Sequence, residues 1–152
     1  MLYLLALLIG IVAGLRAMTA PAAISWAAYL GLLDLSGSWL SFLASPWAVG
    51  ILSVLALVEF VTDQLPSTPS RKVPPQFGAR IFMGAVCGAA IGSASGFWIA
   101  GLVLGVAGAV VGTLGGAAVR QRLAARFGRD LPAALIEDAV AILAALGIVW
   151  SL

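Results

Sequence analysis

The stretch GVAGAVVGTLGG, residues 105–116, contains no charged side chain and places Gly108, Gly112 and Gly116 at intervals of four. Glycines with this spacing lie on one face of a helix and let a second helix backbone approach closely, as in membrane helix pairs. The same spacing recurs at Gly10/Gly14, Gly84/Gly88/Gly92/Gly96 and Gly101/Gly105. We therefore predict an all-α bundle with tight, Gly-rich packing. The stripe on the fifth helix either packs within one chain or forms a homodimer seam.

Composition assigns this bundle to a membrane. The chain has 152 residues, is 62% hydrophobic and 9% charged, and contains no histidine, whereas soluble domains are about 25% charged. Many apolar stretches approach the roughly 17 to 25 residues that cross a bilayer. We expect one integral membrane domain over residues 1–152, surrounded by lipid. The basic residues lie in loops rather than on a soluble face, so we expect no nucleic-acid partner. A single cysteine, Cys87, excludes an intrachain disulfide.

The hydrophobic segments predict about six transmembrane or half helices. We place them, within a few residues, at about 2–15, 20–33, 46–63, 78–95, 97–119 and 131–151. Arginine and lysine accumulate in cytoplasmic loops, and all eight basic residues then fall on one side. We therefore expect a multi-pass protein of the bacterial inner membrane, with cytoplasmic loops at 64–77 and 120–130. Tryptophans collect at the opposite face.

A weak internal similarity suggests a 3+3 inverted repeat. Without gaps, residues 10–31 align with residues 84–105, which matches Gly10 with Gly84 and Gly14 with Gly88. The halves would be 1–63 and 78–152, and inverted repeats are characteristic of many transporters. As an alternative, the short segments on either side of Arg16 form a broken or re-entrant hairpin.

Carboxylates in the apolar helices mark the candidate site. Glu59 and Asp63, four residues apart in LALVEFVTDQLP (55–66), share one helix face, where their charges repel. Because such charges are costly in a membrane, each needs a proton, a cation or an arginine partner. Glu137 and Asp138 form a second acidic pair in the last helix. The full set of candidate ligand- or ion-binding residues is Arg16, Thr19, Glu59, Asp63, Glu137 and Asp138.

Basic residues and expected helix caps accompany these carboxylates in the sequence. Arg16 precedes a helix start in GLRAMTAP (14–21) and either pairs with Glu59 or Asp63 or helps to hold an anion. Thr19 is the expected N-cap of that helix, and Asp130 is the expected N-cap of the last one. Arg120, Arg122, Arg126 and Arg129 are expected to set topology and to touch anionic lipid heads.

Several stretches resemble a bacterial membrane-protein family known as a domain of unknown function, DUF4126. They are AGLRAMTAPAAISWAA, VEFVTDQLPSTPSR, PPQFGARI and GRDLPAALIEDAVAI. The most specific elements are G-L-R-x-x-T-A-P (Gly14–Pro21), E-x-x-x-D-x-x-P (Glu59–Pro66) with the following T-P-x-R (Thr68–Arg71), and the acidic pair of the final helix. The resemblance implies a fold but no mechanism.

Three classes of function fit these observations. The first is a small transporter or channel in which the carboxylates bind a cation or relay protons, with anion or lipid-phosphate binding by Arg16 as a variant. The second is a structural or assembly protein whose ion pairs hold the bundle together. The third, a metal-dependent enzyme acting on a lipid phosphate, is disfavoured because the acidic pattern does not match the aspartate-rich phosphotransferases. We expect no cofactor and no catalytic residues, and leave metal binding open.

Overall fold

The computed structural model describes residues 1–65 and 70–152, and these residues form helices without any β-strand. In chain order they are α1 (Leu2–Leu15), α2 (Thr19–Tyr29), the 3-10 helix η1 (Ser41–Ala44), α3 (Pro46–Thr62), α4 (Pro74–Ser93), α5 (Trp98–Phe127) and α6 (Asp130–Trp150). The all-α prediction is confirmed.

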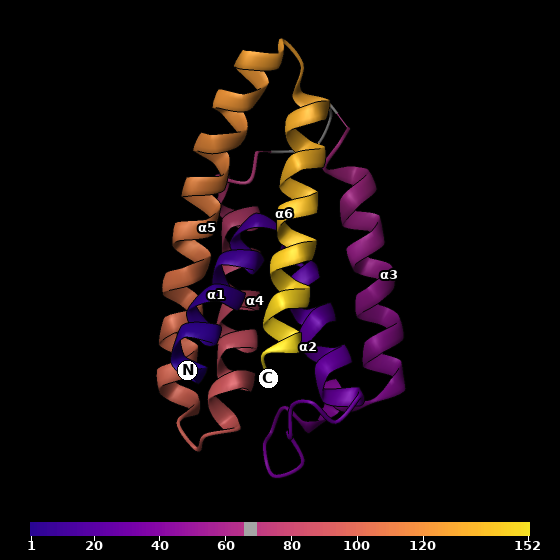
Figure 1. The fold of residues 1–152 in the computed structure, drawn as a ribbon, viewed down its shortest axis with the longest axis vertical. Helices are drawn as coiled ribbons and strands as arrows, with labels where there is room; N and C mark the ends of the chain where they lie inside the picture. The colour runs from indigo at the N-terminus through magenta and orange to yellow at the C-terminus, as the bar shows by residue number, and fades with distance from the viewer. Residues whose placement is uncertain (66–69) are drawn as a thin grey trace.

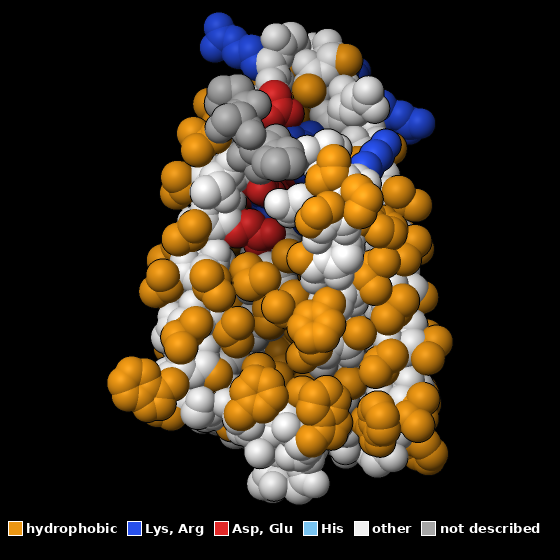
Figure 2. Space-filling model, turned by 180° about the vertical axis from the view of Figure 1, so that it is seen from behind, with side chains coloured by type: hydrophobic (Ala, Val, Ile, Leu, Met, Phe, Trp, Pro, Cys, Tyr) orange, Lys and Arg blue, Asp and Glu red, His pale blue; other side chains and the backbone are white. Residues whose placement is uncertain are grey.

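The helices alternate in direction along the long axis of the molecule. Both chain ends lie at one end of the bundle, and the connections α3 to α4 and α5 to α6 lie at the other (Figure 1). We call the latter the charged end, because lysine, arginine and acidic side chains gather there, whereas hydrophobic side chains cover most of the remaining surface on the face shown in Figure 2.

Helix length and composition together identify the elements that are suited to cross a membrane. In the described part of the chain, α5 and α6 are long and apolar enough to do so, while α1 and α3 are apolar but shorter. At 1.5 Å per residue, α1 and α2 rise only roughly 21 and 17 Å, less than the roughly 30 Å hydrocarbon core. Their connecting turn, residues 16–18, places Arg16 and Ala17 in the interior. We call these three residues, which join α1 to α2, the hairpin turn.

Glycines bring α1, α4 and α5 into backbone contact. A Cβ added at Gly10 would lie 2.3 Å from the Gly105 carbonyl oxygen, and one at Gly88 would lie 2.2 Å from that of Gly101. A Cβ at Gly112 would lie 2.2 Å from the Ile11 carbonyl oxygen. Any larger residue would therefore collide with main chain. The fifth-helix glycine stripe is covered largely within one chain, by α1 and α4.

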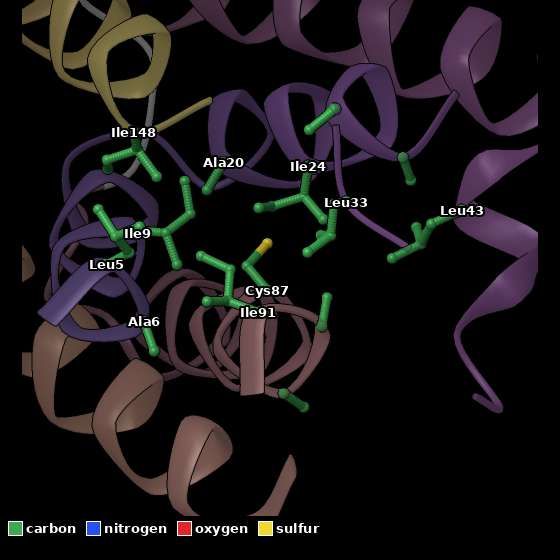
Figure 3. Close-up of a cluster of buried hydrophobic side chains, with 14 of the residues drawn as sticks. Leu5, Ala6, Ile9, Ala20, Ile24, Leu33, Leu43, Cys87, Ile91 and Ile148 are labelled. Atoms are coloured by element: carbon green, nitrogen blue, oxygen red, sulfur yellow. The ribbon is translucent and has the colours of Figure 1, made fainter. Parts of the chain in front are cut away.

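Below the charged end, an apolar core fills the space between α1, α2, α4 and α6. Ile9, Ile24, Cys87 and Ile91 are buried there, and Figure 3 shows their side chains pointing towards one another. Leu33 and Leu43 reach the same cluster from the segment between α2 and α3. Cys87 is a buried core residue with a free thiol.

Three predicted boundaries were wrong. The helix expected at 20–33 ends at Tyr29, because Gly31 takes a left-handed backbone (φ 76°) and turns the chain. The helix expected at 78–95 begins at Pro74, since prolines fit the first positions of a helix.

The third correction concerns the expected loop 120–130. Helix α5 continues through it to Phe127 and stops at Gly128, whose φ of 68° suits a helix C-terminus. Alanine, leucine and arginine in RLAARF are good helix formers, so the helix extends past the last apolar turn.

The proposed repeat does not keep its register in this fold. The first turn lies at residues 16–18, whereas the second lies at 94–97, which the ungapped alignment pairs with residues 20–23. Within the loop expected at 64–77, Pro66 and Thr68 of the two quoted motifs lie outside the described residues.

Candidate functional site

Six segments bring charged side chains together at the charged end. The hairpin turn supplies Arg16, and helix α3 with its C-cap residue supplies an acidic pair one turn apart, Glu59 and Asp63. Helices α4, α5 and α6 and the segment before α4 supply the remaining members. We call this set the ion-pair network, and it comprises Arg16, Glu59, Asp63, Arg71, Arg80, Arg120, Asp130, Glu137 and Asp138.

Arg16 is the centre of the network. Its side chain has 0% exposure and forms ion pairs with Asp63, at the end of α3, and with Asp138 of α6. The Arg16 Nε donates a 2.6 Å hydrogen bond to Asp138 Oδ1, and its guanidinium carbon lies 5.9 Å from the centre of the Phe60 ring. A charge can be buried this deeply only when counter-charges accompany it. Arg16 therefore ties the hairpin turn to two separate helices.

Glu59 holds the start of α2. Its two carboxylate oxygens accept hydrogen bonds from the backbone N–H groups of Ala17 and Met18, both at 2.8 Å. A negative charge stabilises the N-terminus of a helix, where N–H groups lack partners. The cap was expected from Thr19, and that prediction was wrong: α2 has no side-chain cap of its own. Among the described residues, the buried Thr19 hydroxyl has no hydrogen-bond partner.

This arrangement predicts that Glu59→Ala destabilises the protein by about 2 kcal/mol, the upper range for loss of a cap. The loss should be local, so hydrogen exchange measured by mass spectrometry should accelerate in the peptide containing residues 16–18. Thr19→Val is the matched control, because it removes a buried hydroxyl without a partner and should be neutral or slightly stabilising. Equal exchange in Glu59→Ala and wild type would contradict this role.

Arg80 performs the complementary task at the end of α1. Its side chain is 3% exposed, and Nη1 donates to the carbonyl oxygens of Gly14 and Leu15 at 3.0 and 2.6 Å. The last carbonyls of a helix lack intrahelical partners and carry partial negative charge. Arg80 Nη2 also lies 3.6 Å from Asp63 Oδ2 and 3.9 Å from Glu59 Oε1. Both ends of the hairpin turn are thus held by charges from other helices.

The acidic pair of α6 faces two different partners. Arg71 pairs with Glu137 through both terminal nitrogens, with a 2.7 Å hydrogen bond from Nη2 to Oε2. Arg120 adds a longer contact to the same oxygen at 3.4 Å. Asp138 instead faces Arg16 and accepts from Gln64 Nε2 at 3.4 Å.

Arg120 closes the network nearest to the end of the bundle. Its Nε and Nη2 donate to the two oxygens of Asp130 at 3.0 and 2.6 Å, and Nη2 also reaches the Asp63 carbonyl oxygen at 3.1 Å. Asp130 was expected to cap α6, but it is the first residue of that helix and pairs with Arg120. Asp34 is the one acidic residue outside the network. It lies in an exposed loop, where hydrogen bonds from Ser36 lower the pKa of its carboxyl group.

Residues of the ion-pair network form part of the wall of an open cavity. Its volume is about 490 Å³. Four basic and two acidic residues line it, together with Ser70, Gln76 and Gln121. Within residues 1–65 and 70–152, no group of three or more acidic or cysteine side chains is placed to hold a metal ion. The charged residues of the lining are Arg71, Lys72, Arg80, Arg120, Asp63 and Asp130.

The structure brings the six predicted site residues to one level of the bundle, five of them inside the ion-pair network and Thr19 beside it. Sequence reasoning missed the basic residues Arg71, Arg80 and Arg120, which it assigned to topology. The sequence does contain a feature that points to Arg80. Pro74 is a suitable helix start, and a helix that begins there places Arg80 almost two turns inside it, where a charged side chain needs a partner.

Taken together, the fold and site define a helical bundle that buries an arginine–carboxylate network at one end of an otherwise apolar molecule. The family model of the domain of unknown function DUF4126 matches residues 3–150. The chain therefore belongs to this family, as the motifs indicated. No curated protein and no solved structure matches the chain.

Proposed function

We propose that the chain is a multi-pass protein of the bacterial inner membrane, with the charged end in the cytoplasm. Support comes from the apolar surface below that end (Figure 2) and from two helices of spanning length. Exposed tryptophans lie in elements at the opposite end, as interfacial residues do. They are Trp39, Trp47, Trp98 and Trp150.

We further propose that this protein binds a small anion in the cavity and moves it across the membrane. The observation that carries the proposal is the charge of the lining, four basic residues against two carboxylates. Clefts lined by an excess of one sign concentrate ions of the other sign. Lys72 supports this most directly, since its exposed ammonium has no ion pair within the described residues.

The contacts of the carboxylates weigh against the cation alternative. Glu59 accepts from two backbone N–H groups, and Asp63 and Asp138 share Arg16. A cation at these oxygens would have to displace a buried arginine, which would then lose its counter-charges. We therefore assign the carboxylates the task of holding the arginines and the hairpin turn in place.

Lys72→Gln tests the anion site without disturbing a buried pair. Hydrogen bonds to charged groups contribute roughly 1.5 to 3 kcal/mol, so the variant should bind inorganic phosphate about tenfold more weakly or worse. Isothermal titration calorimetry of the protein in detergent measures this. The matched control is Arg129→Gln, which removes an exposed charge that does not line the cavity. Unchanged phosphate affinity in Lys72→Gln would contradict the assignment.

A structural or assembly role is the second candidate, because every carboxylate of the network already has a partner. It predicts no phosphate binding by wild type and co-purification with a stoichiometric membrane partner. The same calorimetric titration distinguishes it from the anion proposal.

A further inference from the structure

An apolar groove runs along the outer face of the bundle between α1, α5 and α6. Its volume is about 300 Å³, and Arg120 and Glu137 are the two charged residues in an otherwise apolar lining. Gly115 forms part of its wall, and a Cβ added there would meet no atom within 4 Å. The lining of α5 runs from Val111 to Leu123, roughly 18 Å along the helix axis.

The face of α5 that carries the groove residues Gly115 and Val119 becomes cationic further along the helix, at two arginines beside the groove. Gly115, Val119, Arg122 and Arg126 are separated by four, three and four residues, so they lie on one face. All four are exposed. Neither Arg122 nor Arg126 forms an ion pair or side-chain hydrogen bond within residues 1–65 and 70–152. A ligand that follows this face thus meets apolar surface first and two unpaired positive charges next.

We propose that this groove binds one acyl chain of an anionic phospholipid, with the lipid phosphate against Arg122 and Arg126. The inference rests on the membrane placement proposed above but not on the anion cavity. A linear chain suits the groove, which has a volume of about 300 Å³ and runs roughly 18 Å along the α5 axis. The charge pattern matches a lipid headgroup at a membrane surface, where each basic residue contributes about 1 kcal/mol.

Native mass spectrometry of the purified full chain in detergent tests this proposal. Phosphatidylglycerol and phosphatidylcholine with identical acyl chains are the probes. Wild type should retain one phosphatidylglycerol with a preference of about 10- to 30-fold, the factor expected from two surface arginines. Equal retention of both lipids would overturn the proposal.

Two variants locate the site. Gly115→Leu fills the groove and should weaken phosphatidylglycerol binding at least tenfold, while the double variant Arg122→Gln/Arg126→Gln should abolish the headgroup preference. Gly147→Leu on α6 is the matched control, because its added side chain also meets nothing within 4 Å. If Gly115→Leu bound phosphatidylglycerol as well as wild type does, or if Gly147→Leu lost as much binding as Gly115→Leu, the lipid would not occupy this groove and the proposal would be overturned. A wild-type dimer that Gly115→Leu dissociates would show a second copy as the occupant instead, and phosphate binding in the cavity would be unaffected in each case.

Discussion

Arg16→Met should destabilise the protein by about 3 to 5 kcal/mol, the cost of removing one partner from a buried ion pair. The methionine fills much of the same volume, so the loss comes from charge rather than from a cavity. Asp63 and Asp138 would each remain in the interior without the arginine that now joins them. Equilibrium unfolding in mixed detergent micelles measures the change in the free energy of unfolding.

Two further variants make the Arg16 result interpretable. Arg129→Met removes an exposed arginine that belongs neither to the ion-pair network nor to the proposed lipid site, and should change stability by less than about 0.5 kcal/mol. Arg16→Lys should recover only part of the loss, because an ammonium cannot serve two carboxylates with the planar geometry of a guanidinium. Equal stabilities of Arg16→Met and Arg129→Met would show that the buried network contributes nothing.

Gly105→Ala should cost about 3 kcal/mol, the upper range for overpacking. The added Cβ would lie 2.0 Å from the Gly84 carbonyl oxygen of α4 and 2.9 Å from the Gly84 carbonyl carbon. Both are backbone atoms within a helix, so α4 and α5 would have to move apart. The same unfolding assay applies, and the variant should also raise hydrogen exchange in α4.

The matched control lies ten residues further along α5. A Cβ at Gly115 meets nothing within 4 Å, so Gly115→Ala should be neutral or stabilising by up to about 1 kcal/mol through helix propensity. If Gly105→Ala were as stable as Gly115→Ala, the close approach of α4 and α5 would be wrong.

The lengths of the apolar segments predicted the helices, and the glycine spacing predicted their close packing, because both features can be read from local sequence. The positions at which helices end were harder to predict from the sequence. Nothing local distinguishes a helix that stops at the membrane surface from one that continues, so the extension of α5 to Phe127 depended on Gly128 rather than on the loss of hydrophobicity. The early end of α2 likewise follows from the turn at Gly31.

The candidate site also contains some residues that the sequence identified and others that it did not. The high cost of carboxylates in apolar helices identified Glu59, Asp63, Glu137 and Asp138 without any structure. Their partners depend on tertiary packing: the pairing of Arg71 with Glu137 spans 66 residues, and that of Arg16 with Asp138 spans 122. Such separations leave no local pattern, and for this reason the cavity-lining arginines were assigned to topology.

Proteoliposome flux decides between anion transport and cation transport by this protein. Phosphate, chloride, protons and common cations are screened for wild type, Lys72→Gln, Glu59→Gln and Arg129→Gln, each reconstituted at the same amount of folded protein. We predict saturable anion flux in wild type and Arg129→Gln that Lys72→Gln reduces at least tenfold. Saturable cation or proton flux that Glu59→Gln abolishes and Lys72→Gln leaves intact would contradict the account and assign transport to the carboxylates instead.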